Sequence, residues 1–364
     1  MPRVTITQVA ARAGVSLASA SRALNGQIAS AETVAKVRAA AEELGYVADA
    51  MAQSLKRGRT LQLGYAVADI GNPVYVEMMT AIERVVSASG YRLVLSSASS
   101  AAQTVEVARG LGRGYVDGMI LSPLRVNEEL LDVLSAASVP VVVVGLVPDD
   151  AGFDTVRADS RTAMRLVVDH LVDEGRRRVA FVNGPRDTTP GTLRHDGFHA
   201  AMAAHDGVAH HAVETSDFTI AAGYAAALDL LDSDDRPDAV VAANDLIGIG
   251  VVRAAQDLGL SVPEQLAVTG VDNTELADVV RPGLTSVDLG AEERGRVAAE
   301  LLLARLAEPE RAAHRVTVAP SLVVRGSTVA ALRARPRVGG ADRVDGAGRV
   351  DGADEVGGAE RSAG

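Results

Sequence analysis

Short apolar segments alternate with amphipathic segments along most of the chain from Leu61 onward. The apolar segments are typical of buried strands in parallel sheets and lie at residues 61–69, 91–99, 117–123, 139–145, 177–185, 238–245 and 265–273. Helical spacing of apolar residues predicts helices at 74–90, 127–138, 161–175, 193–205, 223–233, 246–259 and 294–307, with one more through Arg109. A second series of this kind starts near residue 160. The pattern therefore predicts two similar α/β lobes, each a doubly wound parallel sheet covered by helices on both faces.

The first 46 residues carry a different pattern, that of a helix, a tight turn and a second helix. Thr5 is suited to cap the first helix, and Gln8 three residues later completes a capping box. Gly14 tolerates the left-handed backbone that the turn requires, and Ser16 is suited to cap the second helix. Ser30 can cap a third helix. These features predict a three-helix headpiece with helix-turn-helix organisation, which makes DNA the leading partner.

The segment VTITQVAARAGVSLASASRALNG, residues 4–26, closely resembles the DNA-binding headpiece of the lac/galactose-repressor (LacI/GalR) family of transcriptional regulators. The resemblance continues to about residue 330. It implies a bilobal core like that of periplasmic binding proteins, with three chain crossovers between the lobes and a small molecule in the cleft. We place the crossovers near Ala158, Val287 and Pro320.

The resemblance and the patterns together divide the chain into four parts. They are a helix-turn-helix domain over residues 1–46, a hinge helix and linker over 47–60, a core over 61–332 and a tail over 333–364. In the core we expect an N-lobe of about 61–158 and 288–319 and a C-lobe of about 159–287 and 320–332. The tail is rich in Gly and Ala and lacks bulky apolar residues, which predicts disorder. It also lacks the leucine heptad helix that pairs dimers in some family members, so a homodimer is expected.

Charge is divided unevenly along the 364 residues. The whole chain carries −11, but residues 1–60 carry eight Lys/Arg and four acids, or +4, which leaves −15 for the remainder. A small basic module on an acidic body is expected of a DNA-binding head on a core that does not bind DNA, although random surface variation is the alternative. Cysteine is absent, and we find no signal peptide and no apolar run long enough to span a bilayer. The expected location is the cytoplasm, with no membrane partner.

By resemblance, residues 17, 18 and 22 face base edges in the major groove. Arg22 suits a bidentate contact to guanine, with a phosphate contact as the alternative, whereas Leu17 and Ala18 suit contact with thymine methyl groups. Two headpieces in a dimer would read a pseudo-palindromic operator. The serines of this segment are better suited to phosphates than to bases. The full expected DNA-binding set is Thr5, Ser16, Leu17, Ala18, Ser19, Ser21, Arg22, Asn25, Ala52 and Leu55.

The hinge segment carries the second expected DNA contact. In the family, a pair of leucines from two hinge helices wedges into the minor groove, and Ala52 to Leu55 fit that pattern. Ordinary packing of Leu55 in a linker is the alternative. The chain departs from the family at Ala48-Asp49, where Pro-Asn is usual. Asp49 can cap the hinge helix, but it also sets a negative charge close to phosphates.

Ligands of open parallel sheets bind beyond the carboxyl ends of the strands. The effector-binding residues expected there are Asn72, Tyr75, Asn244 and Asp272. The resemblance implies two more, Arg194 and Phe218, which match the arginine and the aromatic residue that contact the ligand in the family. Aromatic rings combined with Arg, Asn and Asp suit a polyol, because the ring covers the C–H face and the polar groups bind hydroxyls. Asp245 is expected to cap the following helix rather than to bind ligand, and Asn72 could serve only to shape the turn before Pro73. Leu289 stands where the family often has a polar ligand contact, which leaves a nucleoside or a modified sugar open.

The leading hypothesis is a ligand-responsive transcriptional repressor that a small sugar-like effector releases from DNA. The alternatives are a nucleoside, purine or modified sugar acting as corepressor, and a solute-binding protein. An enzyme is not expected, because the chain lacks GxGxxG after its first strand, GxxxxGK[ST] and GxSxG. No cofactor and no metal are expected. The histidines, among them His210 and His211, are expected on helix surfaces or in loops.

Overall fold

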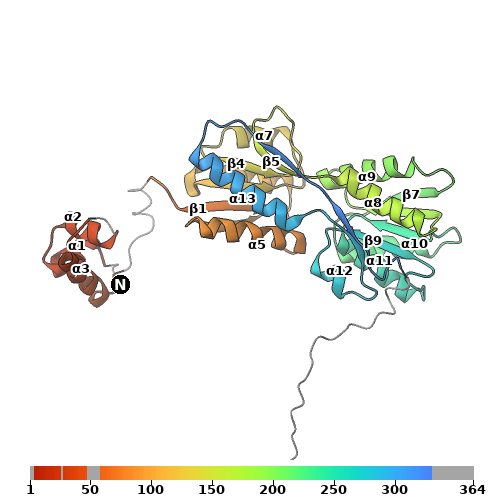
Figure 1. Cartoon of the computed structure of the whole chain (residues 1–364), viewed down its shortest axis with the longest axis horizontal. Coiled ribbons are helices and arrows are strands. Elements are labelled where there is room, and N and C mark those ends of the chain that lie inside the picture. The colour runs from red at the N-terminus through yellow and green to blue at the C-terminus, as the bar shows by residue number, and fades with distance from the viewer. Residues whose placement is uncertain (1–3, 26–27, 47–57, 330–364) are drawn as a thin grey trace, which may run out of the picture. The chain divides into compact units, whose positions relative to one another are not determined.

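The computed structural model describes residues 4–25, 28–46 and 58–329. The expected hinge residues Ala52 and Leu55, together with Asp49 and the tail from residue 330, lie outside these ranges, so those predictions stay untested by the structure. Figure 1 shows a headpiece and two lobes along the chain.

The headpiece contains three helices, as the sequence predicted. They are α1 (Ile6–Ala13), α2 (Leu17–Leu24) and α3 (Ala31–Glu43). Each helix contributes to one small apolar core, which includes Val9 from α1, Ala20 from α2 and Val37 from α3. The fully buried residues of α2 are alanines, which lets the three helices pack closely, and Leu24 is partly buried against the same core. Leu17 and Arg22 of α2 stay exposed.

Local sequence signals explain where these helices begin and end. The Gln8 side chain accepts a hydrogen bond from the backbone N–H of Thr5 at 2.8 Å, so the capping box is formed. Gly14 adopts a φ of 68°, a left-handed conformation that glycine adopts without steric cost. Ser16 accepts from the N–H of Ser19 at 3.1 Å and caps α2.

The first lobe contains a parallel sheet in the order β11-β5-β4-β3-β1-β2. Its strands are β1 (Gln62–Val67), β2 (Arg92–Ser97), β3 (Gly118–Ser122), β4 (Val141–Val144), β5 (Asp154–Ala158) and β11 (Arg315–Val318). Its helical elements are α5 (Pro73–Ala88), α6 (Ala101–Gly110), the π-helical turn η1 (Leu111–Tyr115), α7 (Glu128–Ser135) and α13 (Ala291–Ala307). Buried residues of α5 and α13 pack with Leu63 and Tyr65 of β1, whereas those of α6 and α7 pack with Ala66. Alternate residues of one strand thus face the two helical layers, as in a sheet that is buried on both sides.

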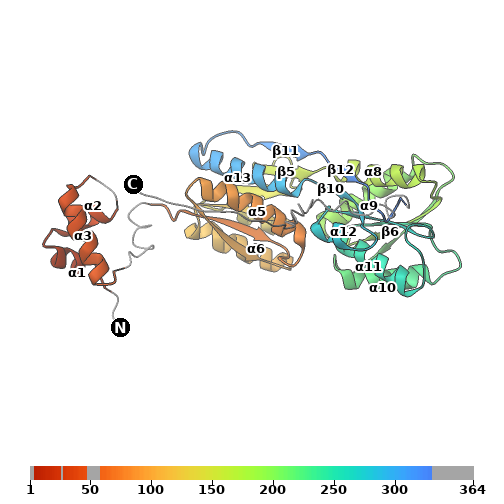
Figure 2. The same cartoon turned by 60° about the horizontal axis from the view of Figure 1, so that its bottom comes forward.

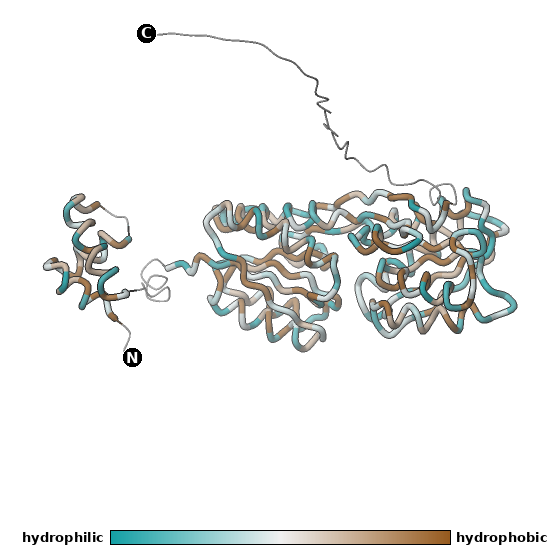
Figure 3. Tube along the Cα trace, turned by 90° about the horizontal axis from the view of Figure 1, so that it is seen from below, coloured by the Kyte–Doolittle hydropathy of each residue, from teal (hydrophilic) through white to brown (hydrophobic). Residues whose placement is uncertain are grey.

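The second lobe repeats this plan in the order β12-β10-β9-β8-β6-β7. Its strands are β6 (Arg178–Asn183), β7 (Ala209–Glu214), β8 (Ala239–Ala242), β9 (Ala267–Val271), β10 (Thr285–Asp288) and β12 (Ser321–Val323). Its helices are α8 (Ser160–Asp173), α9 (Thr189–Met202), α10 (Ile220–Leu231), α11 (Asp245–Asp257) and the short α12 (Glu275–Val279). Figure 2 shows α8 and α9 on one side of this sheet and α10 and α11 on the other. In Figure 3 the hydrophobic stretches run along the inner strands of both lobes.

The expectation of purely parallel sheets holds for the first lobe but needs correction in the second. Strand β12 pairs with β10 in the antiparallel direction, through the register Val287 with Leu322. The physical reason is the short connection from β11, which ends at Val318, to β12, which starts at Ser321. The carboxyl ends of the parallel strands of both sheets face the same pocket, so a chain that leaves β11 at its carboxyl end enters the second sheet from the carboxyl edge and runs against β10.

The chain passes between the two sheets at three points. They are the step from β5 to α8, the step from β10 to α13, and the step from β11 to β12. Each lobe is therefore built from segments that are distant in sequence, and the ends of several strands from both sheets are available to line one site. Within the described residues, no helix is both long enough and apolar enough to cross a bilayer.

Candidate functional sites

One face of α2 presents the residues that the sequence predicted to read DNA. Leu17 is 50% exposed, and Ala18 and Arg22 are exposed, whereas Ala20 and Ala23 of the same helix are buried. No ion pair of Arg22 is seen within the described part of the chain, so its charge is available to a partner.

The smaller polar residues of the headpiece partly serve the helix itself. The side chain of Asn25 donates to the backbone carbonyl of Ser21 at 2.7 Å and closes the end of α2. The hydroxyl groups of Ser16 and Ser19 lie 2.9 Å apart at its start. Thr5 lies exposed at the cap of α1. Ser16, Ser19 and Asn25 lie on or beside α2, whereas Thr5 lies at the start of α1, and a contact of each with DNA stays a prediction.

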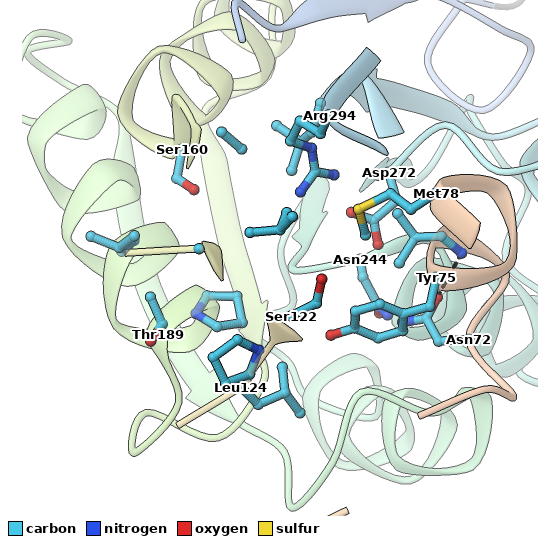
Figure 4. A pocket seen from close by; sticks show the side chains of 18 of the residues that line it. Asn72, Tyr75, Met78, Ser122, Leu124, Ser160, Thr189, Asn244, Asp272 and Arg294 are labelled. Carbon is cyan, nitrogen blue, oxygen red and sulfur yellow. Dashed lines mark hydrogen bonds between the residues drawn. The ribbon is translucent and has the colours of Figure 1, made fainter. Parts of the chain in front are cut away.

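A pocket of about 160 Å³ is lined by residues from both lobes. Asn72 and Tyr75 come from the loop and helix after β1 in the first lobe, and Ser122 follows at the end of β3. The second lobe contributes four of the residues expected from the sequence, Arg194, Phe218, Asn244 and Asp272. Figure 4 shows Tyr75, Ser122, Asp272 and Asn244 around the same open space. All six expected effector-binding residues therefore line one pocket, beyond the carboxyl ends of the strands.

Two asparagines of the pocket are held by the helices that they begin. The side chain of Asn72 accepts from the N–H of Val74 at 3.2 Å and caps α5. Asn244 accepts from the N–H of Ile247 at 2.9 Å and caps α11, while its amide group donates to the carbonyl of Phe218 at 3.3 Å. Both asparagines keep capacity for further hydrogen bonds on a fixed side chain.

The prediction that Asp245 caps α11 is wrong. Asn244, one residue earlier, takes that position, and Asp245 lies buried in the first turn of the helix. Its carboxylate accepts from the backbone N–H of Thr274 at 2.7 Å, from the hydroxyl of the same residue at 2.9 Å, and from Ser286. Burial raises the pKa of Asp245 to about 7, and the nearby charge of Asp272 adds to the effect. Asp245 thus holds the loop that carries Asp272 instead of facing the pocket.

Asp272 has an unusual backbone and a buried carboxylate. Its φ is 105°, outside the regions that a residue with a side chain readily adopts, and Asn273 follows with a φ of 52°. The Asp272 carboxylate lies 3.3 Å from the guanidinium of Arg194, which also donates to the carbonyl of Ala243 at 2.6 Å. Burial raises the pKa of Asp272, although the positive charges of Arg194 and Arg294 oppose the shift. Strain of this kind is typical of residues kept in place for binding.

Two aromatic rings complete the pocket wall. Phe218 is 9% exposed and lies against Gly184, where a Cβ atom would come within 2.2 Å of the ring. Gly184 therefore leaves the space that the ring of Phe218 needs. Tyr75 presents its ring and hydroxyl to the pocket (Figure 4), and burial raises its pKa, so the phenol stays protonated as a hydrogen-bond donor.

The sequence reasoning missed Arg294, which lies in the first turn of α13 and lines the same pocket. Its guanidinium points into the open space in Figure 4. A signal was present in the sequence, because a cation in the first turn of a helix lies at the positive end of the helix dipole and is unfavourable there. Nothing in the sequence, however, indicated that this turn of α13 faces the second lobe.

Polar contacts also join the lobes at the rim of the pocket. Arg125 of the first lobe forms a two-pronged ion pair with Asp187 of the second, with nitrogen–oxygen distances of 2.7 and 3.0 Å. The backbone N–H of Thr189 donates to the carbonyl of Leu124 at 2.7 Å. The pocket is thus bordered by contacts that a change of lobe angle would break.

The histidines need one correction. His210 and His211 lie on the edge strand β7, because this polar segment pairs with β6 instead of forming a loop. Within the described residues, no group of His, Cys, Asp or Glu has the arrangement of a metal site.

Comparison with known proteins decides the family. Residues 5–49 match the model of bacterial regulatory proteins of the lacI family, and residues 168–328 match the model of a periplasmic binding protein-like domain. The ribose operon repressor of Escherichia coli (strain K12) is 33% identical over 327 residues, which cover 89% of this chain and 99% of that protein. The chain belongs to the LacI family.

Further relatives of this LacI-family protein have the same arrangement over most of their length. The regulator CelR of Thermobifida fusca is 33% identical over 337 residues, 89% of this chain and 98% of that protein. The Lac repressor dimer bound to operator and the anti-inducer ONPF superposes with a TM-score of 0.81 at 27% identity, covering 90% of this chain and 100% of that one. The CelR–cellobiose complex gives a TM-score of 0.67 at 31% identity, with 89% and 100% covered. The predicted fold and the assignment as a ligand-responsive, DNA-binding transcriptional regulator are confirmed.

Proposed function

We propose that this LacI-family regulator is a repressor whose homodimer binds a pseudo-palindromic operator and is released when a sugar-like molecule occupies the pocket between its lobes. The observation that carries this proposal is the pocket itself, because rings, amides and charged groups from both lobes converge on one space. Ribose and cellobiose appear in the names of related regulators, which supports a sugar-like effector.

On the DNA side, we infer that Leu17, Ala18 and Arg22 read base edges. Their exposure on one face of α2 supports this role, since the helix buries only small residues on its other face. A bidentate contact of Arg22 to guanine would contribute roughly 1–3 kcal/mol of discrimination. The hinge residues Ala52 and Leu55 are proposed to contact the minor groove, and residues 47–60 to connect the headpiece to the core.

On the effector side, we infer that ligand binding and operator binding are coupled through the angle between the lobes. One particular angle between the lobes allows two contacts to form, the Arg125–Asp187 ion pair and the hydrogen bond from Thr189 to Leu124. A ligand that binds both lobes selects the angle at which all of its contacts form. Linkage then requires that operator DNA weakens ligand binding by the same factor by which ligand weakens DNA binding.

The experiment that tests this proposal uses promoter fragments upstream of the protein's own gene in a gel-shift or fluorescence-anisotropy assay. Arg22→Ala is expected to lose sequence preference and to keep ligand binding, with Arg38→Ala as the control, since Arg38 is an exposed arginine on α3. Asp272→Ala is expected to keep operator binding that no ligand relieves. Equal effects of both variants on both activities would contradict the division of labour between headpiece and core.

A second candidate effector is a nucleoside or purine that acts as a corepressor. Buried Leu289 and the ring of Phe218 favour it, because both give the pocket apolar surface on which a flat base can lie. The HTH-type transcriptional repressor PurR of Pectobacterium atrosepticum is 32% identical over 329 residues. Addition of hypoxanthine or guanine to the operator-binding assay distinguishes the two, because a corepressor strengthens DNA binding and an inducer weakens it.

A further inference from the structure

Arg294 differs from the other cations of the pocket because its terminal nitrogens have no partner within the part of the chain that the structure describes. Its Nε atom is buried and forms no hydrogen bond, as is also the case for Arg157 and Arg194. Unlike those two arginines, Arg294 has no ion pair or hydrogen bond of its terminal nitrogens within the described residues. Burial lowers its pKa, which means that the surroundings disfavour the charge that it carries. The Arg294 side chain is only partly buried, and its N–H groups find no acceptor among the described residues, so an acceptor group on a bound ligand would stabilise it.

The backbone holds Arg294 firmly in this position. The next residue is Gly295, where a Cβ atom would lie 2.5 Å from the carbonyl oxygen of Met78 on α5. Helix α13 therefore packs closely against α5 at this point, which positions the backbone from which Arg294 reaches the pocket. Met78 itself is buried and lines the same pocket.

The carboxylates near Arg294 are already engaged. Asp272 binds Arg194 at 3.3 Å, and it is the one buried carboxylate among the described residues that line the pocket. Asp69 also lines the pocket, but it is exposed and accepts from the N–H of Gly71 at 2.7 Å. Glu77 does not line the pocket. Burial is the main cause that raises its pKa, and the opposing effect of the Arg294 charge is the smallest of the contributions.

The remaining arginine of the pocket also has a partner. Arg157 donates to the carboxylate of Asp149 and to the carbonyl of Val147, both at 2.9 Å. The inner part of the pocket thus contains two arginines, Arg194 and Arg294, and one carboxylate, Asp272, which leaves one positive charge without a counterion. Hydroxyl groups of a neutral polyol can accept hydrogen bonds from Arg294, but they cannot balance this charge.

We propose that the effector carries an acidic group, a carboxylate or a phosphate, which Arg294 binds, while the other pocket residues bind its polyol part. This inference rests on the proposed function, since it assigns the chemical class of the effector in the same pocket. A planar guanidinium suits both oxyanions, because each offers two oxygens to a pair of N–H groups. The ligand class is therefore an acidic sugar, either a sugar acid or a sugar phosphate.

The test compares each acidic sugar with its neutral parent by isothermal titration calorimetry on the full-length protein. The probes are D-glucose, D-glucuronate and D-glucose 6-phosphate, D-galactose and D-galacturonate, and D-ribose and D-ribose 5-phosphate. We expect an acidic member to bind about tenfold or more tightly than its neutral parent, as a charge-assisted hydrogen bond implies. The sugar acids and the sugar phosphates distinguish the two possible acidic groups.

Variants of Arg294 assign the effect to this side chain. Arg294→Gln is expected to weaken binding of the acidic sugar by about tenfold or more and to leave its neutral parent nearly unchanged, and Arg294→Lys should restore part of the difference. The matched control is Arg296→Gln on the same helix, because Arg296 is exposed and pairs with Glu293 and Glu300 outside the pocket. Operator binding by each variant without ligand shows that it folds.

Tighter binding of a neutral sugar than of its acidic derivative would overturn this inference, as would the failure of every acidic probe to bind. Loss of affinity for acidic and neutral sugars alike in Arg294→Gln would also overturn it, because Arg294 would then serve the shape of the pocket and not the charge of the ligand. Release of the operator by a neutral sugar would leave the proposed function intact while refuting the acidic ligand. Failure to bind any operator would refute the proposed function and leave the calorimetric comparison valid.

Discussion

Replacement of Asp245 by asparagine tests the electrostatics that support the pocket. In the folded protein the carboxylate is buried and accepts hydrogen bonds from Thr274 and Ser286. An asparagine at this position can still accept from Thr274 through its oxygen. Its amide group can donate to the hydroxyl oxygen of Ser286, which also accepts from the N–H of Asn273. The substitution therefore removes the charge and keeps the hydrogen bonds.

The pKa of Asp245 rises from 3.8 to about 7 on folding. Below about pH 4 both the folded and the unfolded states hold the proton. Between about pH 4 and pH 7 the unfolded chain releases its proton while the folded protein keeps it, so the free energy of unfolding falls as pH rises. The difference between the two pKa values corresponds to a loss of roughly 4 kcal/mol in the free energy of unfolding, and this loss is complete above about pH 7. Asp245→Asn is therefore expected to be more stable than the natural protein at pH 8, by up to this amount, and to differ little at pH 4.

The assay is urea denaturation followed by far-ultraviolet circular dichroism at intervals from pH 4 to pH 8. The control is Asp257→Asn at the end of the same helix, because Asp257 is exposed and accepts from the hydroxyl of Tyr224 at 2.9 Å. This control should retain the pH dependence of the natural protein. Parallel pH profiles for the natural protein and Asp245→Asn would refute the reasoning, since the buried carboxyl would then not be the group that titrates.

Two other substitutions test the packing of the headpiece and of the second lobe. Ser16→Ala removes the side chain that caps α2 and should lower the stability of this helix by about 1 kcal/mol. The backbone amides of α2 should then exchange with solvent about fivefold faster. Ser16→Asn is the control, because it keeps a capping side chain. Unchanged exchange in Ser16→Ala would show that the cap does not stabilise α2. Gly223→Ala places a Cβ atom 2.5 Å from the carbonyl oxygen of Ile247, where α10 and α11 meet. This overlap should lower the free energy of unfolding, measured by urea denaturation, by roughly 1–3 kcal/mol. Gly110→Ala, which meets no atom within 4 Å at the end of α6, is the control, and equal effects of the two alanines would contradict close packing at Gly223.

The headpiece could be predicted from sequence because its signals are local. Thr5 with Gln8, Ser16, and Gly14 each act on residues within one helical turn, and the structure has them in these roles. The inner strands could be predicted for a similar reason, since a strand buried on both faces is apolar along its whole length. The helices between them followed from apolar residues at helical spacing.

Strands with mixed composition could not be found in this way. β5, β7, β10, β11 and β12 carry no continuous apolar run. Strand β7 is exposed along most of its length and pairs with β6 on one side only, so its residues need not be apolar. In β10 the buried Thr285 is satisfied by hydrogen bonds with Thr328 and with the backbone of Arg325, partners about 40 residues away. Pairing with a neighbour, not composition, makes these segments strands.

For the pocket, the position of Asp272 at the carboxyl end of a predicted strand was enough to name it, whereas Arg194, which lies within α9, was named from the family resemblance. The structure brings the two residues into contact across 78 positions of sequence. Only the tertiary structure decided how their charges are balanced. Whether a charge in the pocket has a partner depends on groups contributed by several distant segments. The role of Asp245 has no signature in its neighbouring residues, and the position of Arg294 in the first turn of α13 did not indicate that its guanidinium reaches the pocket. Local order is encoded by short-range contacts, whereas the electrostatics of a pocket arise from the packing of the whole core.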